Sequence, residues 1–269
     1  MPFATPRRRP AATAVIALMV ALSATACGTS SSTGADSAKD PKGSSGSKGA
    51  EDGAKAFAAK PAKEIVDAAT RATTAAQSLS VDMKIKAEEG AISGKIALNR
   101  ASECKGTVTV GKEGTAELLK PKGPIGYMRF DETLLRTQGE FSSDEQRDAV
   151  LKVLRGKWVK TDTTKADEKD MLRFCDLDGL LGEWEGDTGT ARKEGETTVD
   201  GRKAIKLTEV DAGVTYRIYV AAEGTPHILK IEQVGGTEPG TMTFSDFDLP
   251  VQAEKPAAKD IIDLDSPTG

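Results

Sequence analysis

The chain has 269 residues, of which 38% are hydrophobic and only 4% aromatic, and its formal net charge is −4. This length allows one large domain or two small ones, and the core must rely on Val, Ile, Leu and small side chains. An acidic chain without a basic stripe argues against nucleic acid as a partner. His227 is the only histidine, which excludes a metal site built from several histidines.

The N-terminus predicts export. Three arginines at positions 7–9 precede an apolar run over residues 11–22 that is too short to span a bilayer, and small residues lead up to Cys27. We therefore expect a signal peptide over residues 1–26. Its removal changes the net charge from −4 to −7, because it carries three arginines and no acid.

The stretch ending at Cys27 resembles the lipobox of bacterial lipoproteins, although Ala24 stands where that motif usually has Leu. The resemblance implies that the Cys27 thiol carries acyl chains such as palmitate, which would anchor the protein to the cell membrane on its extracytoplasmic face. The alternative is an ordinary secretory signal in which Cys27 is incidental. Residues 27–56 are mostly Ser, Gly, Thr, Lys and Asp and predict a disordered tether with a reach of about 30 Å. The folded domain should then occupy residues 57–269.

Two cysteines remain once Cys27 is set aside. Outside the cytoplasm an even pair is expected to be oxidised, so we predict a Cys104–Cys175 disulfide that ties covering helices to a sheet. The alternative is a pair of buried, unbonded thiols.

Periodicity predicts a helix followed by an antiparallel meander. The helix should begin near Pro61, in its first turn, with an apolar stripe formed by Ile65, Ala69, Ala72, Ala76 and Leu79. Alternating apolar residues predict strands over residues 81–87, 92–98, 104–110, 116–120 and 125–130.

The second half should be helical and then return to strands. Ser142 and Glu145 match a capping box before an apolar side formed by Val150, Leu151 and Leu154, and a second helical region is expected over residues 171–181. Residues 158–159 predict a short extended piece. Later strands are expected over residues 197–199, 203–210, 214–220, 227–234 and 241–247, with Asp200-Gly201 as the clearest hairpin turn.

No catalytic constellation is apparent. There is no G-x-S-x-G motif, and His227 lies in a strand pattern, so it should be an ordinary sheet residue. Asp176-Leu177-Asp178-Gly179 starts like a calcium loop, but its glycine comes too early. The acids at positions 246, 248, 260, 263 and 265 are spaced like solvated residues. We expect no enzyme activity, no metal and no cofactor.

The order of segments, with the Asp200-Gly201 hairpin, Gly224-Thr225-Pro226 and the closing run from Phe244 to Pro250, resembles the LolA-like proteins. It is similar in particular to actinobacterial lipoproteins related to LprG and LppX, over roughly Pro61 to Leu264. The resemblance implies an α+β fold in which one curved antiparallel sheet wraps a few helices as a half-barrel. The space between sheet and helices would receive acyl chains.

The leading hypothesis is a carrier of an acylated lipid in a cleft between sheet and helices. We expect that cleft to be lined by Val81, Met83, Ile85, Ile96, Leu98, Val108 and Val110 from the strands, and by Met171, Leu172, Leu180 and Leu181 from the helical side. For each residue the alternative is plain core packing. The second hypothesis is a regulatory or interaction module for an envelope protein partner, similar to RseB-type sensors, and the third is a hydrolase.

Overall fold

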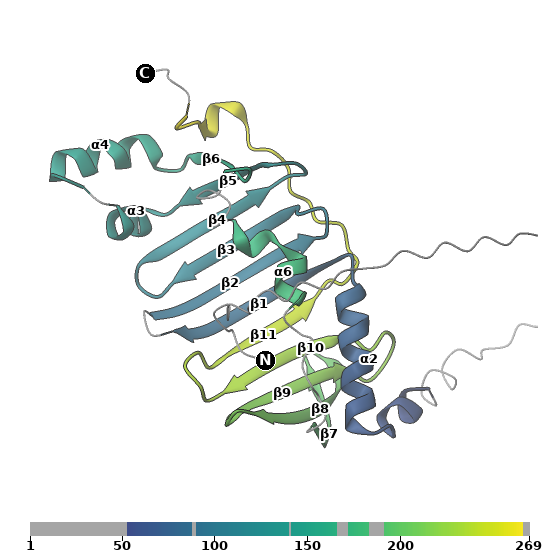
Figure 1. The fold of residues 1–269 in the computed structure, drawn as a ribbon. Coiled ribbons are helices and arrows are strands. Elements are labelled where there is room, and N and C mark those ends of the chain that lie inside the picture. Colours follow the sequence, from purple (N-terminus) through teal and green to yellow (C-terminus); the bar gives the residue numbers. More distant parts are fainter. Residues whose placement is uncertain (1–52, 88–89, 140, 166–171, 183–190, 266–269) are drawn as a thin grey trace, which may run out of the picture.

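One open, curved sheet of 12 strands forms the body of the molecule, with a few helices against it (Figure 1). The computed structural model describes residues 53–87, 90–139, 141–165, 172–182 and 191–265. The spatial order of the strands is β12-β6-β5-β4-β3-β2-β1-β11-β10-β9-β8-β7, and every pair is antiparallel except β12 with β6. This confirms the expected α+β class with a single antiparallel sheet.

Two consecutive meanders make up this sheet. The first contains β1 (Ser78–Ala87), β2 (Gly90–Asn99), β3 (Cys104–Val110), β4 (Gly114–Lys120), β5 (Ile125–Phe130) and β6 (Trp158–Asp162). The second contains β7 (Arg192–Val199), β8 (Arg202–Asp211), β9 (Val214–Ala221), β10 (Ile228–Val234) and β11 (Gly240–Ser245), and the short β12 (Ile261–Ile262) closes the far edge. The meanders join in the middle, where Val81 lies opposite Ile96 on β2 and Phe244 on β11.

Turn chemistry explains the hairpin between β7 and β8. Asp200 and Gly201 both have positive φ, 47° and 79°, and the flanking Val199 and Arg202 are paired. Two successive positive φ values are what a two-residue hairpin turn of the favoured twist requires, and Asp-Gly adopts them readily. The predicted hairpin is therefore confirmed.

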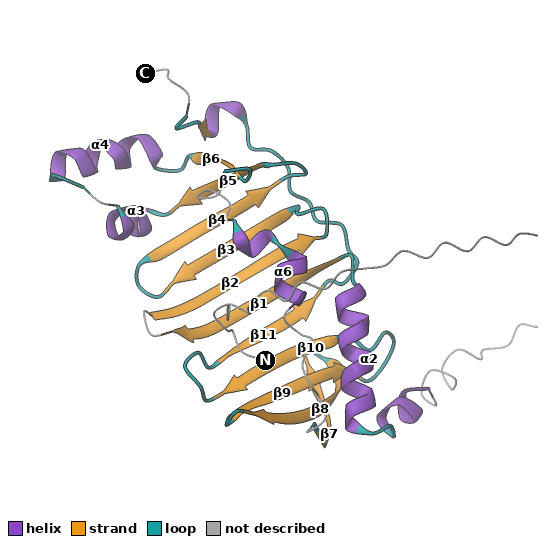
Figure 2. Cartoon of the chain, in the orientation of Figure 1, coloured by secondary structure: helices purple, strands orange, loops and turns teal. Residues whose placement is uncertain are grey.

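The first long helix, α2 (Ala62–Ala75), lies across one face of the sheet and contacts β9 and β10. Figure 2 shows α2 and the short α6 (Leu177–Gly182) on the same side, which we call the inner face. Ile65, Ala69 and Ala76 are buried as predicted. Thr73 is also fully buried, and its Oγ1 accepts a hydrogen bond from the Ile228 amide at 2.8 Å, which fixes α2 to β10.

Three details of the predicted helices differ in the structure. Pro61 is the N-cap residue of α2 rather than part of its first turn, and Leu79 belongs to β1 because the helix ends at Ala75. The predicted cap of α4 (Asp144–Leu154) is shifted by one residue: Ser143 Oγ accepts from the Gln146 amide at 3.2 Å. The same S/T-x-x-E/Q spacing occurs at both positions, so the pattern alone does not distinguish them.

Arg100 connects several elements at one end of the sheet. It follows β2, donates from Nε to the Ala76 carbonyl at 2.9 Å, and pairs with Asp178 on α6. A cation near the last carbonyls of a helix is favourable, because those carbonyls lack partners within the helix. Within the described residues, no helix is both long and apolar enough to cross a bilayer.

Candidate functional site

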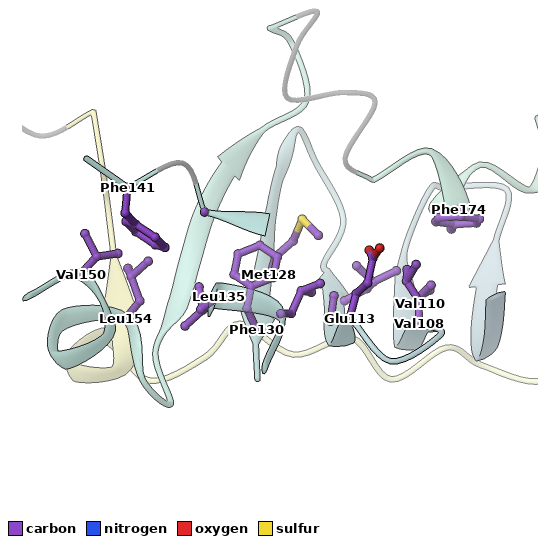
Figure 3. Close-up of a pocket in the computed structure, with 14 residues that line it drawn as sticks. Val108, Val110, Glu113, Met128, Phe130, Leu135, Phe141, Val150, Leu154 and Phe174 are labelled. Atoms are coloured by element: carbon purple, nitrogen blue, oxygen red, sulfur yellow. The ribbon is translucent and has the colours of Figure 1, made fainter. Parts of the chain in front are cut away.

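An apolar cavity of about 700 Å³ lies between the inner face of β3–β5 and the helical segments opposite (Figure 3). Its lining comes from three strands, from α3 (Glu132–Gln138) and α4, and from the 3-10 helix η1 (Arg173–Cys175). The lining residues are Val108, Val110, Glu113, Ala116, Leu118, Met128, Phe130, Leu134, Leu135, Gly139, Phe141, Val150, Leu154 and Phe174. Glu113 is the one charged residue in this described set.

Strand alternation builds the floor of the cavity. Only every second residue of a strand faces inward, and here those residues are valine, leucine, methionine, phenylalanine and alanine. Ala116 lies at the middle of this floor, opposite Val108 on β3 and Phe130 on β5. Its small side chain leaves space that a larger residue would fill.

Helix α3 forms part of the wall, and a single aspartate fixes where it begins. Asp131 is the N-cap: its Oδ1 accepts from the Leu134 amide at 2.7 Å, and its Oδ2 accepts from the Thr115 amide of β4 at 2.9 Å. Gly114 makes this contact feasible, because a Cβ there would lie 2.4 Å from the Leu134 amide nitrogen, and its φ is +130°. At the other end, Thr137 Oγ1 donates to the Glu113 carbonyl at 2.7 Å.

Helix α4 is joined to α3 by charged side chains. Glu132 on α3 accepts hydrogen bonds from Arg136 on its own helix and from Arg155 just after α4. The hydrogen bond from Arg136, followed by the charge of Arg155, holds the pKa of the Glu132 carboxyl below its usual value. These contacts place Val150 and Leu154 at one end of the cavity, as Figure 3 shows.

The predicted disulfide is next in sequence to Phe174, which lines the opposite end of the cavity. Cys104, the first residue of β3, is bonded to Cys175, the last residue of η1, with 5.2 Å between the Cα atoms. The bond ties the short helical segment to the sheet, as the sequence predicted. It also positions the adjacent Phe174, whose ring lies at the end of the cavity opposite Phe141 (Figure 3).

The predicted lining residues divide into several groups. Val108 and Val110 line the cavity. Val81, Met83, Ile96 and Leu98 are buried in the main core, as are Leu172 and Leu181. Ile85 and Leu180 are half-buried, and Met171 lies outside the described residues. The cavity is thus displaced from the middle of the sheet toward β4 and β5.

The sequence analysis did not predict most of the residues that line the cavity, although the sequence contains patterns that point to some of them. The inward positions of β4 and β5, namely Ala116, Leu118, Met128 and Phe130, follow the same alternation as the strands that were selected. Val150 and Leu154 were recognised as the apolar side of a helix but not as cavity residues. Helix α3 was not predicted, so Leu134 and Leu135 had no assigned place.

His227 and the acidic clusters have structural partners. His227 stacks on Phe247 with ring centroids 3.9 Å apart, and burial lowers the pKa of its imidazole. Asp176 Oδ1 accepts from the Gly179 amide at 3.0 Å, which caps the start of α6. Within the described ranges, no group of three or more His, Cys, Asp or Glu side chains is arranged to hold a metal ion.

No protein-family model and no curated protein matches the chain. Among solved structures, it is similar to LprF from Mycobacterium bovis, at 12% identity over 73% of this chain and 97% of that one, with a TM-score of 0.47. It is also similar to the lipoprotein LppX from Mycobacterium tuberculosis, at 15% identity over 74% and 99%, with a TM-score of 0.43. The MucA/MucB complex of Pseudomonas aeruginosa gives 14% identity over 74% and 59%, with a TM-score of 0.31. LppX belongs to the group that the order of segments resembles.

Proposed function

We propose that this protein is a lipid-anchored, extracytoplasmic lipoprotein that holds an acyl chain in the cavity between β3–β5 and the α3–α4 pair. The observation that carries the proposal is the cavity itself, about 700 Å³ with almost entirely aliphatic and aromatic walls. Ligand pockets in proteins commonly have volumes of about 300–1,000 Å³ and mostly apolar walls. Each methylene moved from water into such a site contributes about 0.8 kcal/mol.

The proposed anchor is the Cys27 thiol, and it rests on the sequence because Cys27 lies outside the described residues. Two acyl chains give stable membrane attachment, whereas one gives only marginal binding. The Cys27→Ser variant, expressed in the native host, should therefore leave the membrane fraction. Unchanged fractionation of that variant would contradict the anchor.

The binding proposal is tested with delipidated protein and a fluorescent fatty acyl probe. We expect saturable uptake of the probe, competition by unlabelled fatty acid, and copurified lipid in native mass spectrometry of protein taken from its own envelope. Delipidated wild-type protein that takes up no probe would overturn the carrier function.

A second candidate is an interaction module for an envelope protein. Val153 on α4 is 55% exposed, on the helix that carries the cavity residues Val150 and Leu154. Absence of probe uptake, together with capture of a defined envelope protein that Val153→Glu abolishes, would favour this function.

A further inference from the structure

The outer face of the sheet carries an uneven distribution of charge. On this face, the outward positions of β1, β2 and β3 hold four lysines, Lys84, Lys86, Lys95 and Lys105, and one acid, Asp82. All four lysines are exposed. Lys86 stands at the end of β1 and is followed in sequence by Glu88 and Glu89, which lie outside the described residues. We therefore define the lysine face by Lys84, Lys95 and Lys105.

On the flanks of the same face, several cations form ion pairs. On the β7–β10 side and on the β4–β6 side, the ion pairs are Lys206–Glu194, Lys230–Glu232, Arg129–Glu117 and Lys160–Asp263. Among the described residues, none of the three lysines of the lysine face forms an ion pair. Their side chains are exposed on a protein that is acidic as a whole.

Many of the residues beside these lysines are small and polar. Lys84 lies opposite Ser93 on β2 and Thr241 on β11. Lys95 lies opposite Thr107 on β3 and opposite Asp82, the one acid of this face, on β1. No described helix crosses this part of the outer face in Figure 2. Long lysine side chains that extend beyond short Ser and Thr side chains can reach an anionic surface together.

We propose that the lysine face docks the domain on the anionic phospholipid headgroups of the membrane to which Cys27 anchors it. The partner follows from charge complementarity and from the tether that the sequence predicts over residues 27–56, with an expected reach of about 30 Å. A tethered site experiences an effective concentration in the millimolar range, so a weak patch suffices. Each lysine at such a surface strengthens attachment about fivefold, and three strengthen it about 100-fold.

Docking by the outer face has a consequence for the cavity. The cavity lies on the inner face, on the opposite side of the sheet. In the docked state the cavity therefore lies on the side of the sheet away from the anchoring membrane. The inference rests on the anchor at Cys27 but not on acyl-chain binding, and the two can be tested separately.

The test uses the lipidated full chain in vesicles of phosphatidylcholine, with or without phosphatidylglycerol. Cosedimentation with both vesicles establishes the anchor, and absence of cosedimentation would refute that part alone. Amine acetylation followed by peptide mass spectrometry then reports the exposure of each lysine. We expect Lys84, Lys95 and Lys105 to react at least about fivefold more slowly on phosphatidylglycerol vesicles, and the protection to disappear at high salt.

Lys122, Lys152 and Lys255 provide matched internal controls, since all three are exposed and lie outside the lysine face. Their reactivity should be the same on both vesicles. Equal reactivity of the lysine face on both vesicles would overturn the proposal. Protection by a soluble polyanion, with none from vesicles, would overturn it in favour of an anionic polymer as the partner.

A variant adds a second readout. A fluorophore on Ser93→Cys, between Lys84 and Lys95, should transfer energy to a labelled headgroup lipid when phosphatidylglycerol is present. Replacing Lys84, Lys95 and Lys105 by Gln should abolish that signal, whereas the same change at the three control lysines should leave it intact. A signal that survives the first triple replacement would contradict the role of these lysines.

Discussion

A larger side chain in the floor of the cavity distinguishes a site that binds an acyl chain from an ordinary packed core. Ala116 faces the cavity between Val108 and Phe130, on the middle strand of the floor. The Ala116→Phe variant places a ring where the ligand would lie. We expect the domain to remain folded and the acyl probe to bind much more weakly.

The magnitude follows from the space that the ring takes up. A phenyl group in the middle of the floor displaces about four methylenes of an acyl chain, which removes about 3 kcal/mol at about 0.8 kcal/mol per methylene. That loss corresponds to a dissociation constant about 150-fold higher. The melting temperature should change little, because the ring enters existing space. In a solid core, by contrast, overpacking costs about 1–3 kcal/mol.

Thr107→Phe is the matched control. Thr107 lies on the neighbouring strand β3 and is exposed on the outer face, so the same ring there does not reach the cavity. Probe titration and thermal melting are measured for both variants. If Ala116→Phe unfolds the protein, Ala116 lies in ordinary core. If it binds the probe as tightly as Thr107→Phe does, the ligand lies elsewhere.

Three further measurements address stability. Replacing Cys104 and Cys175 by Ala opens a link with a sequence separation of 71 residues and should lower the free energy of unfolding by about 4 kcal/mol, and an unchanged urea midpoint would contradict this. Burial lowers the pKa of His227 below its ordinary 6.5, so its contribution to stability is complete above pH 6.5 and decreases as the pH falls toward the lowered pKa. His227→Gln should flatten that part of the stability profile, and an identical slope would exclude His227 as its source. The hydrogen bond from Arg136 lowers the pKa of Glu132 below its ordinary 4.5, so its link to α4 should be intact above pH 4.5 and be lost as the pH falls through the lowered pKa. Faster hydrogen exchange of α4 in Glu132→Gln at neutral pH would show the same loss, and unchanged exchange would count against the link.

Local pattern was sufficient for much of the sheet. The alternation in residues 81–87 and 92–98 identified β1 and β2 and the face that each buries, because side-chain direction has a period of two. The predicted disulfide was equally accessible, since it depended on the compartment and on an even count of cysteines. What local pattern could not supply was the pairing of β1 with β11, which joins residues more than 150 positions apart.

The location of the cavity could not be predicted from the sequence for a related reason. The alternation of apolar residues along a strand identifies which side chains face inward, but it does not show which helices pack over them. Ile96 and Val108 are both inward and belong to the same buried core cluster, yet only Val108 also lines the cavity. The difference comes from the coverage of the sheet: α2 contacts β7, β9 and β10, and the disulfide-linked η1 contacts β2. Helix α3 contacts β4 and α4, and both helices contribute residues to the cavity.

Helix α3 forms part of the wall of the cavity, and the sequence features that fix its position are a polar residue and a glycine rather than an apolar pattern. It has seven residues, too few for an apolar stripe to be distinguished from chance. Its position depends on the two hydrogen bonds of the Asp131 carboxylate and on the missing side chain of Gly114. The apolar residues of the floor create the affinity for an acyl chain, but a glycine and an aspartate hold the wall in place above them. A search for apolar residues alone therefore finds the core of this protein before it finds the cavity.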